Sequence, residues 1–215
     1  MIRPWVLISG ASSGFGEASA RLLAEEGWNL LLTSRRHARL NAVAEVCRAS
    51  GAEVHVASWD IRNRKETQEG VHALMTAADI HQNRTGLTLT ALVNNAGLAV
   101  GKGPFDAGLD EDWDRMIDTN VKGLLFLARA CVPFMTSGSR MVNMGSIAGK
   151  QVYTGGNVYC ASKHAVDALS QAMRIDLVDR GIGVSQICPG AAETEFSTVR
   201  FKGDQAAADE VYRGF

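Results

Sequence analysis

The chain has 215 residues, of which 46% are hydrophobic and 21% charged, and its formal net charge at pH 7 is −1. These values predict one globular domain over residues 1–215, with enough apolar side chains to form a core. The balanced charge, with no basic run, argues against binding to nucleic acid or to an anionic membrane surface. No apolar stretch approaches the ~18 residues of a membrane-spanning helix.

Short apolar runs alternate with longer amphipathic segments along the whole chain. Strands are expected at Trp5–Ser9, Asn29–Thr33, Glu53–Ala57, Leu89–Asn94, Arg140–Met144 and Gly183–Cys188. Helices are expected at 15–26, 37–50, 63–82, 112–135 and 157–180. This alternation predicts an α/β protein with a single doubly wound (Rossmann-type) parallel sheet and helices on both faces.

Polar residues and glycines follow each expected strand directly. They are Gly10–Gly16, Ser34-Arg35, Asp60, Asn94–Gly97, Ser146 and Pro189-Gly190, in the order of the six strands. The carboxyl ends of parallel strands share one edge of a sheet, and ligands bind beyond that edge. We therefore expect these residues to surround one ligand site.

The segment Ser9–Gly16 joins the first strand to the first helix. Gly10, Gly14 and Gly16 have the spacing G-x-x-x-G-x-G, which allows a tight turn and a close approach to a pyrophosphate at the helix N-terminus. The alternative is a tight strand-to-helix turn that binds no ligand.

The end of the second strand indicates which dinucleotide would bind. It reads Thr33-Ser34-Arg35-Arg36, and the next acidic residue is Glu45. A carboxylate at this point would hold the 2′-hydroxyl of NAD, whereas an arginine suits the 2′-phosphate of NADP. We expect NADP, held by Arg35; a solvated arginine at a helix start is the alternative, more for Arg36 than for Arg35.

Two further strand ends have an open interpretation. Asp60 could accept a hydrogen bond from the adenine amino group, or it could equally be the N-cap of the following helix. Asn94-Asn95-Ala96-Gly97 suits a bend that passes close to the cofactor, although Asn95 could belong to a purely structural turn.

Tyr159 and Lys163 stand one helical turn apart on the same face. A neighbouring ammonium can lower the pKa of a phenol from ~10 towards neutrality, which suits protonation of an oxyanion. Ser146, thirteen residues earlier, could donate to a substrate carbonyl or be ordinary turn chemistry. Asn120 falls inside an otherwise apolar helix and needs a partner, for which a water leading to Lys163 is one candidate.

Together these motifs resemble the short-chain dehydrogenase/reductase family from residue 5 to the end. The glycine turn is Ser9–Gly16, the family's N-N-A-G is Asn94–Gly97, and its P-G-x-x-x-T is Pro189–Thr194. The resemblance implies a catalytic tetrad of Asn120, Ser146, Tyr159 and Lys163. It also implies NADP contacts from Gly10, Ser12, Ser13, Gly14, Phe15, Gly16, Arg35, Arg36, Asp60, Ile61, Asn94, Ala96, Gly97, Tyr159, Lys163, Pro189, Gly190 and Thr194.

In that family the tyrosine protonates the alkoxide, and the lysine holds the nicotinamide ribose and lowers the pKa of the tyrosine. A narrower likeness, carried by Gly97–Gly101, Met116–Asn120, Gly155–Tyr159 and Glu193–Asp204, extends to the branch of NADP-dependent 3-hydroxy acid dehydrogenases. Related reductases of that branch act on short anionic aldehydes, including sulfoacetaldehyde. The branch implies a small-molecule substrate, a 3-hydroxy acid or a short anionic aldehyde.

Recognition of such a substrate would need cationic or polar side chains, and the candidates are Lys150, Tyr153, Arg200 and Lys202. Solvated loop charges or a subunit contact are the alternative for Arg200 and Lys202. Lys150–Tyr153 and Cys160 depart from the branch, so another small alcohol, diol or sugar stays open as the substrate. A non-catalytic NADP-binding sensor is the remaining alternative.

The four cysteines and five histidines are scattered without metal-binding spacing, so we expect no metal site and reduced thiols in a cytoplasmic protein.

Excess apolar surface on the helices around 112–135 and 157–180 predicts a homodimer or homotetramer. Relatives continue with another helix and a seventh strand, whereas this sequence stops at Phe215. Either a tail is omitted or the sheet lacks an edge strand.

Overall fold

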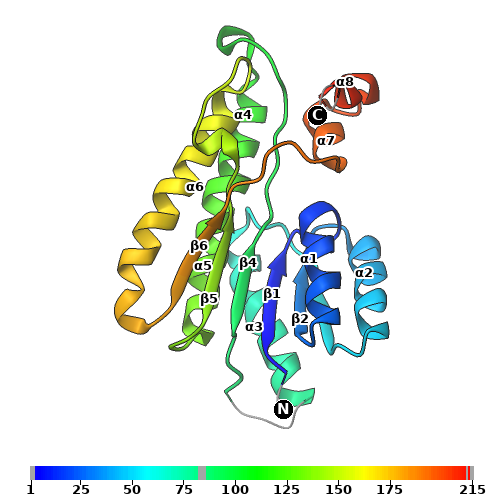
Figure 1. Ribbon diagram of the computed structural model, residues 1–215, viewed down its shortest axis with the longest axis vertical. Coiled ribbons are helices and arrows are strands. Elements are labelled where there is room, and N and C mark those ends of the chain that lie inside the picture. Colours follow the sequence, from blue (N-terminus) through cyan, green and yellow to red (C-terminus); the bar gives the residue numbers. More distant parts are fainter. Residues whose placement is uncertain (1–2, 82–85, 212, 214–215) are drawn as a thin grey trace.

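The computed structural model describes residues 3–81, 86–211 and 213, which contain a six-stranded parallel sheet. The strands are β1 (Trp5–Ser9), β2 (Asn29–Thr33), β3 (Val54–Ala57), β4 (Ala91–Asn94), β5 (Arg140–Met144) and β6 (Gly183–Ile187), arranged in the order β3-β2-β1-β4-β5-β6 (Figure 1). The order reverses beside β1, which pairs with β2 on one side and β4 on the other. A ligand site is therefore expected beyond the carboxyl end of β1.

Helices cover both faces of the sheet. One face packs against α1 (Gly14–Glu25) and α2 (His37–Ala49), and the other packs against α3 (Arg64–His81), α5 (Leu124–Cys131) and α6 (Asn157–Asp176). All five side chains of β1 are buried, and they alternate between the two cores. Burial on both faces explains why the apolar run in this strand is not interrupted by polar residues. The predicted fold class is confirmed.

The observed boundaries differ from the expected ones in specific places. The expected helix over 112–135 consists of α4 (Asp110–Ile117), a π-helical segment η2 (Asp118–Gly123), α5 and a 3-10 segment η3 (Val132–Phe134). The expected helix over 157–180 ends with α6 at Asp176, and a 3-10 segment η5 (Val178–Arg180) follows. The expected end of the third helix at residue 82 lies outside the described residues.

Several short elements surround the carboxyl end of the sheet. They are η1 (Phe105–Ala107), η4 (Ile147–Gly149), α7 (Glu195–Arg200) and α8 (Gln205–Glu210). Figure 1 shows α7 and α8 set apart from the sheet, above the start of α1. Neither helix was among the expected elements, because six residues hold too little periodicity to be recognised.

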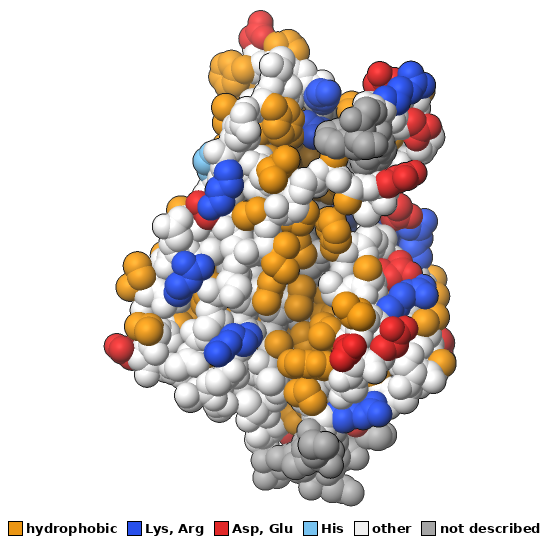
Figure 2. Space-filling view, viewed as in Figure 1, with side chains coloured by type: hydrophobic (Ala, Val, Ile, Leu, Met, Phe, Trp, Pro, Cys, Tyr) orange, Lys and Arg blue, Asp and Glu red, His pale blue; other side chains and the backbone are white. Residues whose placement is uncertain are grey.

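Some hydrophobic side chains near the last two strands of the sheet are exposed to solvent. Figure 2 shows a strip of hydrophobic side chains between the α6 side and the α1–α2 side of the molecule. Ile147 and Ile187, after and within the last two strands, are 57% and 51% exposed. In the part of the chain that the structure describes, no helix is long and apolar enough to cross a membrane.

Candidate active site

One cleft of about 760 Å³ follows the carboxyl edge of the sheet. It collects residues from all six strand ends, which confirms that these segments surround one site. Of the residues expected at the site, those that line the cleft are Gly10, Ser12, Ser13, Gly14, Phe15, Arg35, Arg36, Asp60, Ile61, Ala96, Gly97, Ser146, Tyr153, Tyr159, Lys163, Pro189, Gly190, Thr194 and Arg200.

The glycine turn makes one end of the cleft. Gly10 and Gly14 have φ angles of +66° and +55°, which side chains other than glycine rarely adopt. A Cβ built on Gly14 would lie 3.6 Å from Thr194, so it would narrow the space between the turn and the opposing wall. Gly16 does not line the cleft; a Cβ there would lie 2.4 Å from the Gly10 carbonyl oxygen, so Gly16 allows α1 to approach the turn.

Asparagines at the end of β4 hold the neighbouring elements together. The Asn95 amide donates to the Ser9 carbonyl at 2.8 Å, and the Ser9 hydroxyl accepts from the Asn95 backbone N–H at 3.0 Å. Asn94 is buried behind the cleft wall and donates to the Leu124 carbonyl at 3.0 Å. The structural interpretation of Asn95 therefore fits its contacts, and the Asn94 side chain does not face the ligand space.

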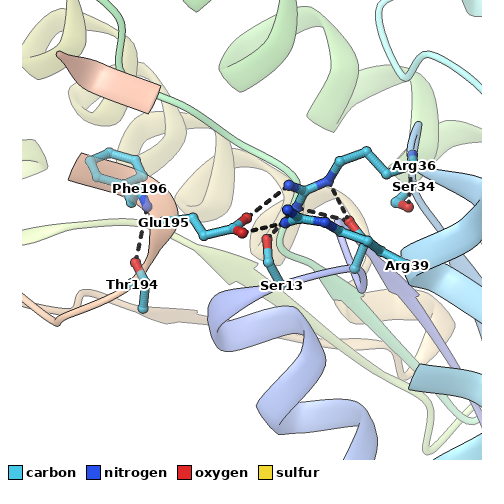
Figure 3. Close-up of polar contacts among 8 residues, drawn as sticks. Ser13, Ser34, Arg36, Arg39, Thr194, Glu195 and Phe196 are labelled. Atoms are coloured by element: carbon cyan, nitrogen blue, oxygen red, sulfur yellow. Dashed lines mark hydrogen bonds and ion pairs between the residues drawn. The ribbon is translucent and has the colours of Figure 1, made fainter. Parts of the chain in front are cut away.

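Arg35 and Arg36 differ in how they are held. Arg35 is exposed and donates no hydrogen bond to any described residue, and partial desolvation lowers the pKa of its guanidinium. Arg36 donates to the hydroxyls of Ser13 at 2.6 Å and Ser12 at 3.1 Å, and its Nη1 lies 2.8 Å from Glu195 (Figure 3). Arg36 is thus bound to the glycine turn, although it stands at the start of α2 and its side chain is 42% exposed.

Asp60 lines the cleft after β3 and forms an ion pair with Arg62 at 2.6 Å. The hydrogen bonds from Arg62 hold the pKa of this carboxyl below its usual range. The first turn of α3 is capped by Asn63 instead, whose side chain accepts from the backbone N–H groups of Lys65 and Glu66. The N-cap interpretation of Asp60 is therefore wrong.

Tyr159 is 8% exposed and lies on the cleft wall, in the first turn of α6. Its ring packs against Phe196 of α7 with the centroids 5.6 Å apart. Burial raises the pKa of Tyr159 to about 12, and a hydrogen bond with Ser146 opposes that rise. Ser146 also accepts from the Ala148 N–H at 3.1 Å, so it caps the 3-10 turn η4.

Lys163 is 5% exposed, and its Nζ donates to the Met144 carbonyl at 2.8 Å. Nζ lies 6.0 Å from the centroid of the Tyr159 ring, and burial lowers the pKa of Lys163 to about 8. The expectation that Lys163 draws the pKa of Tyr159 towards neutrality is wrong for this structure. Loss of water around both groups dominates, and it favours the neutral form of each.

Asn120 lies in the π-helical segment η2 and is 2% exposed. Its amide donates to the Leu98 carbonyl and accepts from the Leu98 N–H, both at 2.8 Å, and it donates to Ser162 at 3.0 Å. The hydrogen-bond partner expected for this buried amide is therefore the backbone of Leu98, next to Gly97. Asn120 stands behind the cleft wall, and its contacts anchor that wall to α6.

The two lysines among the substrate candidates are paired away from the cleft. Lys150 forms an ion pair with Asp167 at 2.5 Å, and Lys202 forms one with Asp112 at 2.7 Å. Lys202 lies on a second, smaller pocket of about 320 Å³, and Lys150 lines neither pocket. Neither lysine lines the main cleft, although the smaller pocket that Lys202 lines is also bounded by Tyr159 and Arg200.

Arg200 is the candidate cation that does line the cleft. Its guanidinium carbon lies 5.2 Å from the centroid of the Tyr153 ring and 5.7 Å from that of Tyr159. The Nε and Nη2 atoms are buried, and they have no hydrogen-bond partner among the described residues. Buried donors of a charged group normally have partners, so these two nitrogens suit an anionic ligand.

Several cleft residues could not be expected from the sequence, and Glu195, Phe196 and Lys102 are among them. Glu195 and Phe196 stand beside the expected Thr194, but their partners Arg36 and Tyr159 are distant in sequence. Lys102 lines both pockets and lies over the Phe201 ring at 5.8 Å. No group of three or more His, Cys, Asp or Glu side chains suited to a metal ion occurs among residues 3–79 and 86–211.

Comparison with known proteins identifies the architecture. Residues 4–205 match the family model described as short chain dehydrogenase. Sulfoacetaldehyde reductase 2 of Chromohalobacter salexigens is 43% identical over 211 residues, which are 97% of this chain and 80% of that protein. The NADP-dependent 3-hydroxy acid dehydrogenase YdfG of Salmonella typhi is 43% identical over 210 residues, covering 96% of this chain and 80% of that one.

Solved structures agree with this result. The closed form of serine dehydrogenase complexed with NADP+ superposes with a TM-score of 0.86 at 38% identity, covering 98% of this chain and 82% of that one. A short chain dehydrogenase/reductase from Burkholderia phymatum in complex with NAD has the same TM-score at 27% identity, with 98% and 78% coverage. The fold thus accommodates either dinucleotide, and the residues of the cleft decide between them.

Proposed function

Because the chain belongs to the short-chain dehydrogenase family, we propose that it is an NADP(H)-dependent oxidoreductase with Tyr159 as its general acid and base. Its substrate would be a small hydroxyl compound that carries an anionic group, such as a 3-hydroxy acid, and its product the corresponding carbonyl compound. The observation that supports this most is that the glycine turn, Ser146, Tyr159 and Lys163 all line one continuous cleft.

The cleft fits a nicotinamide dinucleotide. The positive φ of Gly14 and the space between it and Thr194 suit a pyrophosphate on the free N–H groups that open α1. Bound NADPH would supply the hydride that reduces a carbonyl carbon. Beyond the glycine turn, Lys163 would hold the nicotinamide ribose, and Thr194, opposite Gly14, would hold the carboxamide.

Tyr159 would complete the reduction by giving its proton to the carbonyl oxygen. With a pKa of about 12 the phenol stays protonated at neutral pH, and Ser146 can orient it and the carbonyl together. Lys163, with a pKa of about 8, is still mainly protonated at pH 7 and can stabilise the negative charge that develops nearby. Asn120 would position this wall through its bonds to Leu98.

NADP is proposed over NAD on the basis of the adenosine end. Arg35 has its guanidinium free to bind a 2′-phosphate, and the one carboxylate that follows β3 at this end, Asp60, is paired with Arg62. A relative named for NADP dependence is 43% identical to this chain. The charges therefore favour a phosphate over a hydroxyl.

An anionic group on the substrate is proposed from Arg200. Its buried Nε and Nη2 atoms lack partners among the described residues and adjoin the ring of Tyr159, so a carboxylate or sulfonate a few bonds from the reacting carbon could bind them. The names of the similar proteins, which act on a 3-hydroxy acid or on sulfoacetaldehyde, agree with such a group. The hydroxyls of a neutral diol or sugar could accept from these donors, but they would leave the charge of the guanidinium unpaired.

Assembly and location are part of the proposal. We infer a homodimer or homotetramer from the exposure of Ile175 on α6 and Val178 beyond it, which are 73% and 64% exposed. The cysteines of the described chain are free, and Cys47, Cys131 and Cys160 are buried. Free buried thiols agree with a cytoplasmic, reducing environment.

A substrate panel tests the proposal. Oxidation of serine, 3-hydroxypropionate and 2-hydroxyethanesulfonate would be followed by NADPH absorbance, with propane-1,3-diol as the uncharged counterpart. We expect turnover of at least one anionic compound, and Arg200→Met should raise its KM about ten- to a hundredfold, since a charge-assisted hydrogen bond contributes ~1.5–3 kcal/mol. Lys150→Met, which removes a cation that pairs with Asp167 and lines neither pocket, should leave that KM nearly unchanged. Equal effects of the two substitutions would reject Arg200 as the anion site.

A further inference from the structure

The side chain of Glu195 crosses from α7 to the start of α2. Its Oε2 lies 2.8 Å from Nη1 of Arg36, and its Oε1 pairs with Nη1 of Arg39. Figure 3 shows the carboxylate of Glu195 facing both guanidinium groups, with Ser13 beside them. One carboxylate of α7 thus pairs with two arginines at the adenosine side of the cleft, and the three groups together keep one positive charge.

All three nitrogens of the Arg36 guanidinium are occupied by protein groups. Nε and Nη2 donate to Ser12 and Ser13 of the glycine turn, and Nη1 faces Glu195. Ser12, Ser13, Arg36 and Glu195 all line the cleft. A phosphate that approaches Arg36 would therefore meet a carboxylate already bound to it. Two anions on one guanidinium repel each other, unless the first one withdraws.

We propose that Glu195 is a specificity-determining residue that competes with the 2′-phosphate of the cofactor for Arg36 and Arg39. This inference rests on the proposed use of NADP. Under this proposal the two arginines have different roles in binding the 2′-phosphate. Arg35 is free to bind it, whereas Arg36 can bind it only after Glu195 has released Arg36. The protein would then bind NADP more weakly than it would if Arg36 and Arg39 were not paired with Glu195.

The same contact would join the two ends of the cleft. Glu195 is the first residue of α7, directly after Thr194 and before Phe196, which packs on the Tyr159 ring. Arg200 is the last residue of the same helix. Release of Glu195 by a 2′-phosphate would therefore free the amino-terminal end of the segment that carries the proposed substrate-binding arginine.

Calorimetric binding of 2′,5′-ADP and 5′-ADP tests the competition without turnover. Glu195→Gln keeps the shape of the side chain and removes its charge. Glu193→Gln removes the same charge two residues away, from a side chain that is exposed and pairs with no described residue. All three proteins would be measured at low and high ionic strength, because the contact is half-exposed and should be screened by salt.

We expect Glu195→Gln to tighten binding of 2′,5′-ADP about two- to tenfold, the range given by two exposed ion pairs. Binding of 5′-ADP should not change, Glu193→Gln should behave as the original protein, and the difference should shrink at high salt. Weaker or unchanged binding of 2′,5′-ADP by Glu195→Gln would overturn the proposal, as would an equal gain in Glu193→Gln. If the unsubstituted protein binds 2′,5′-ADP no better than 5′-ADP, the proposed NADP preference fails; the comparison between the variants still reports on Glu195.

Discussion

Replacement of Lys163 by methionine should change how stability depends on pH. Lys163 is 5% exposed, and burial lowers its pKa from 10.5 to about 8. Between these two values the unfolded chain binds a proton that the folded chain has lost. The free energy of unfolding must therefore rise with pH across this window because of Lys163.

The size of the effect follows from the two pKa values. Both states are protonated at pH 7, so the folded protein carries the full cost of a buried ammonium there. Between about pH 7 and pH 10 that cost is relieved, and linkage with pKa values of about 8 and 10.5 gives roughly 2–3 kcal/mol. Lys163→Met lacks the group, so its stability should gain correspondingly less over the same range.

Urea unfolding followed by tryptophan fluorescence at several pH values would measure this difference. Other groups that titrate in the range contribute equally to both proteins, so they cancel in the comparison. Lys150→Met is a matched control, because that lysine is exposed and paired with Asp167 at the surface. Parallel stability curves for Lys163→Met and the unsubstituted protein would refute the idea that Lys163 is held in an unfavourable, dehydrated position.

Two further predictions concern the walls of the cleft. Arg35→Asp should raise the KM for NADPH far more than that for NADH, because a carboxylate repels the 2′-phosphate and can accept from the 2′-hydroxyl; equal effects on the two cofactors would refute the assignment. Asn120→Leu should lower the free energy of unfolding by roughly 2–4 kcal/mol, since it leaves the buried N–H and carbonyl of Leu98 unpaired. Thr119→Val is its control, because the buried Thr119 hydroxyl has no partner among the described residues, and urea unfolding should find that variant nearly as stable as the original.

The sheet could be predicted well because its signals are local. The run Leu30-Leu31-Leu32 is fully buried, and β1, β2 and β5 have the expected bounds. The glycine turn could also be predicted from the sequence, because its positive φ angles require glycine itself. The features that could not be predicted depend on which residues meet in the folded chain. The long helix around Asn120 contains a π-helical turn, and nothing in its apolar pattern indicates that extra residue.

The errors at the site have the same origin. Lys150 and Lys202 looked suitable by position along the chain, but Asp167 and Asp112 approach them only in the fold. The pair of Glu195 with Arg36 joins residues that are 159 positions apart in the sequence. The pKa of Tyr159 was misjudged because the charge of a neighbour can be read from sequence, whereas the loss of water around a side chain cannot.

The most direct test of the central claim is hydride transfer by Tyr159→Phe. NADPH binding, followed by fluorescence, should stay close to that of the unsubstituted protein, while carbonyl reduction at saturating NADPH should fall roughly 10²–10⁴-fold, the usual contribution of general acid catalysis. Near-normal turnover by this variant would contradict the assignment of Tyr159 as the proton donor.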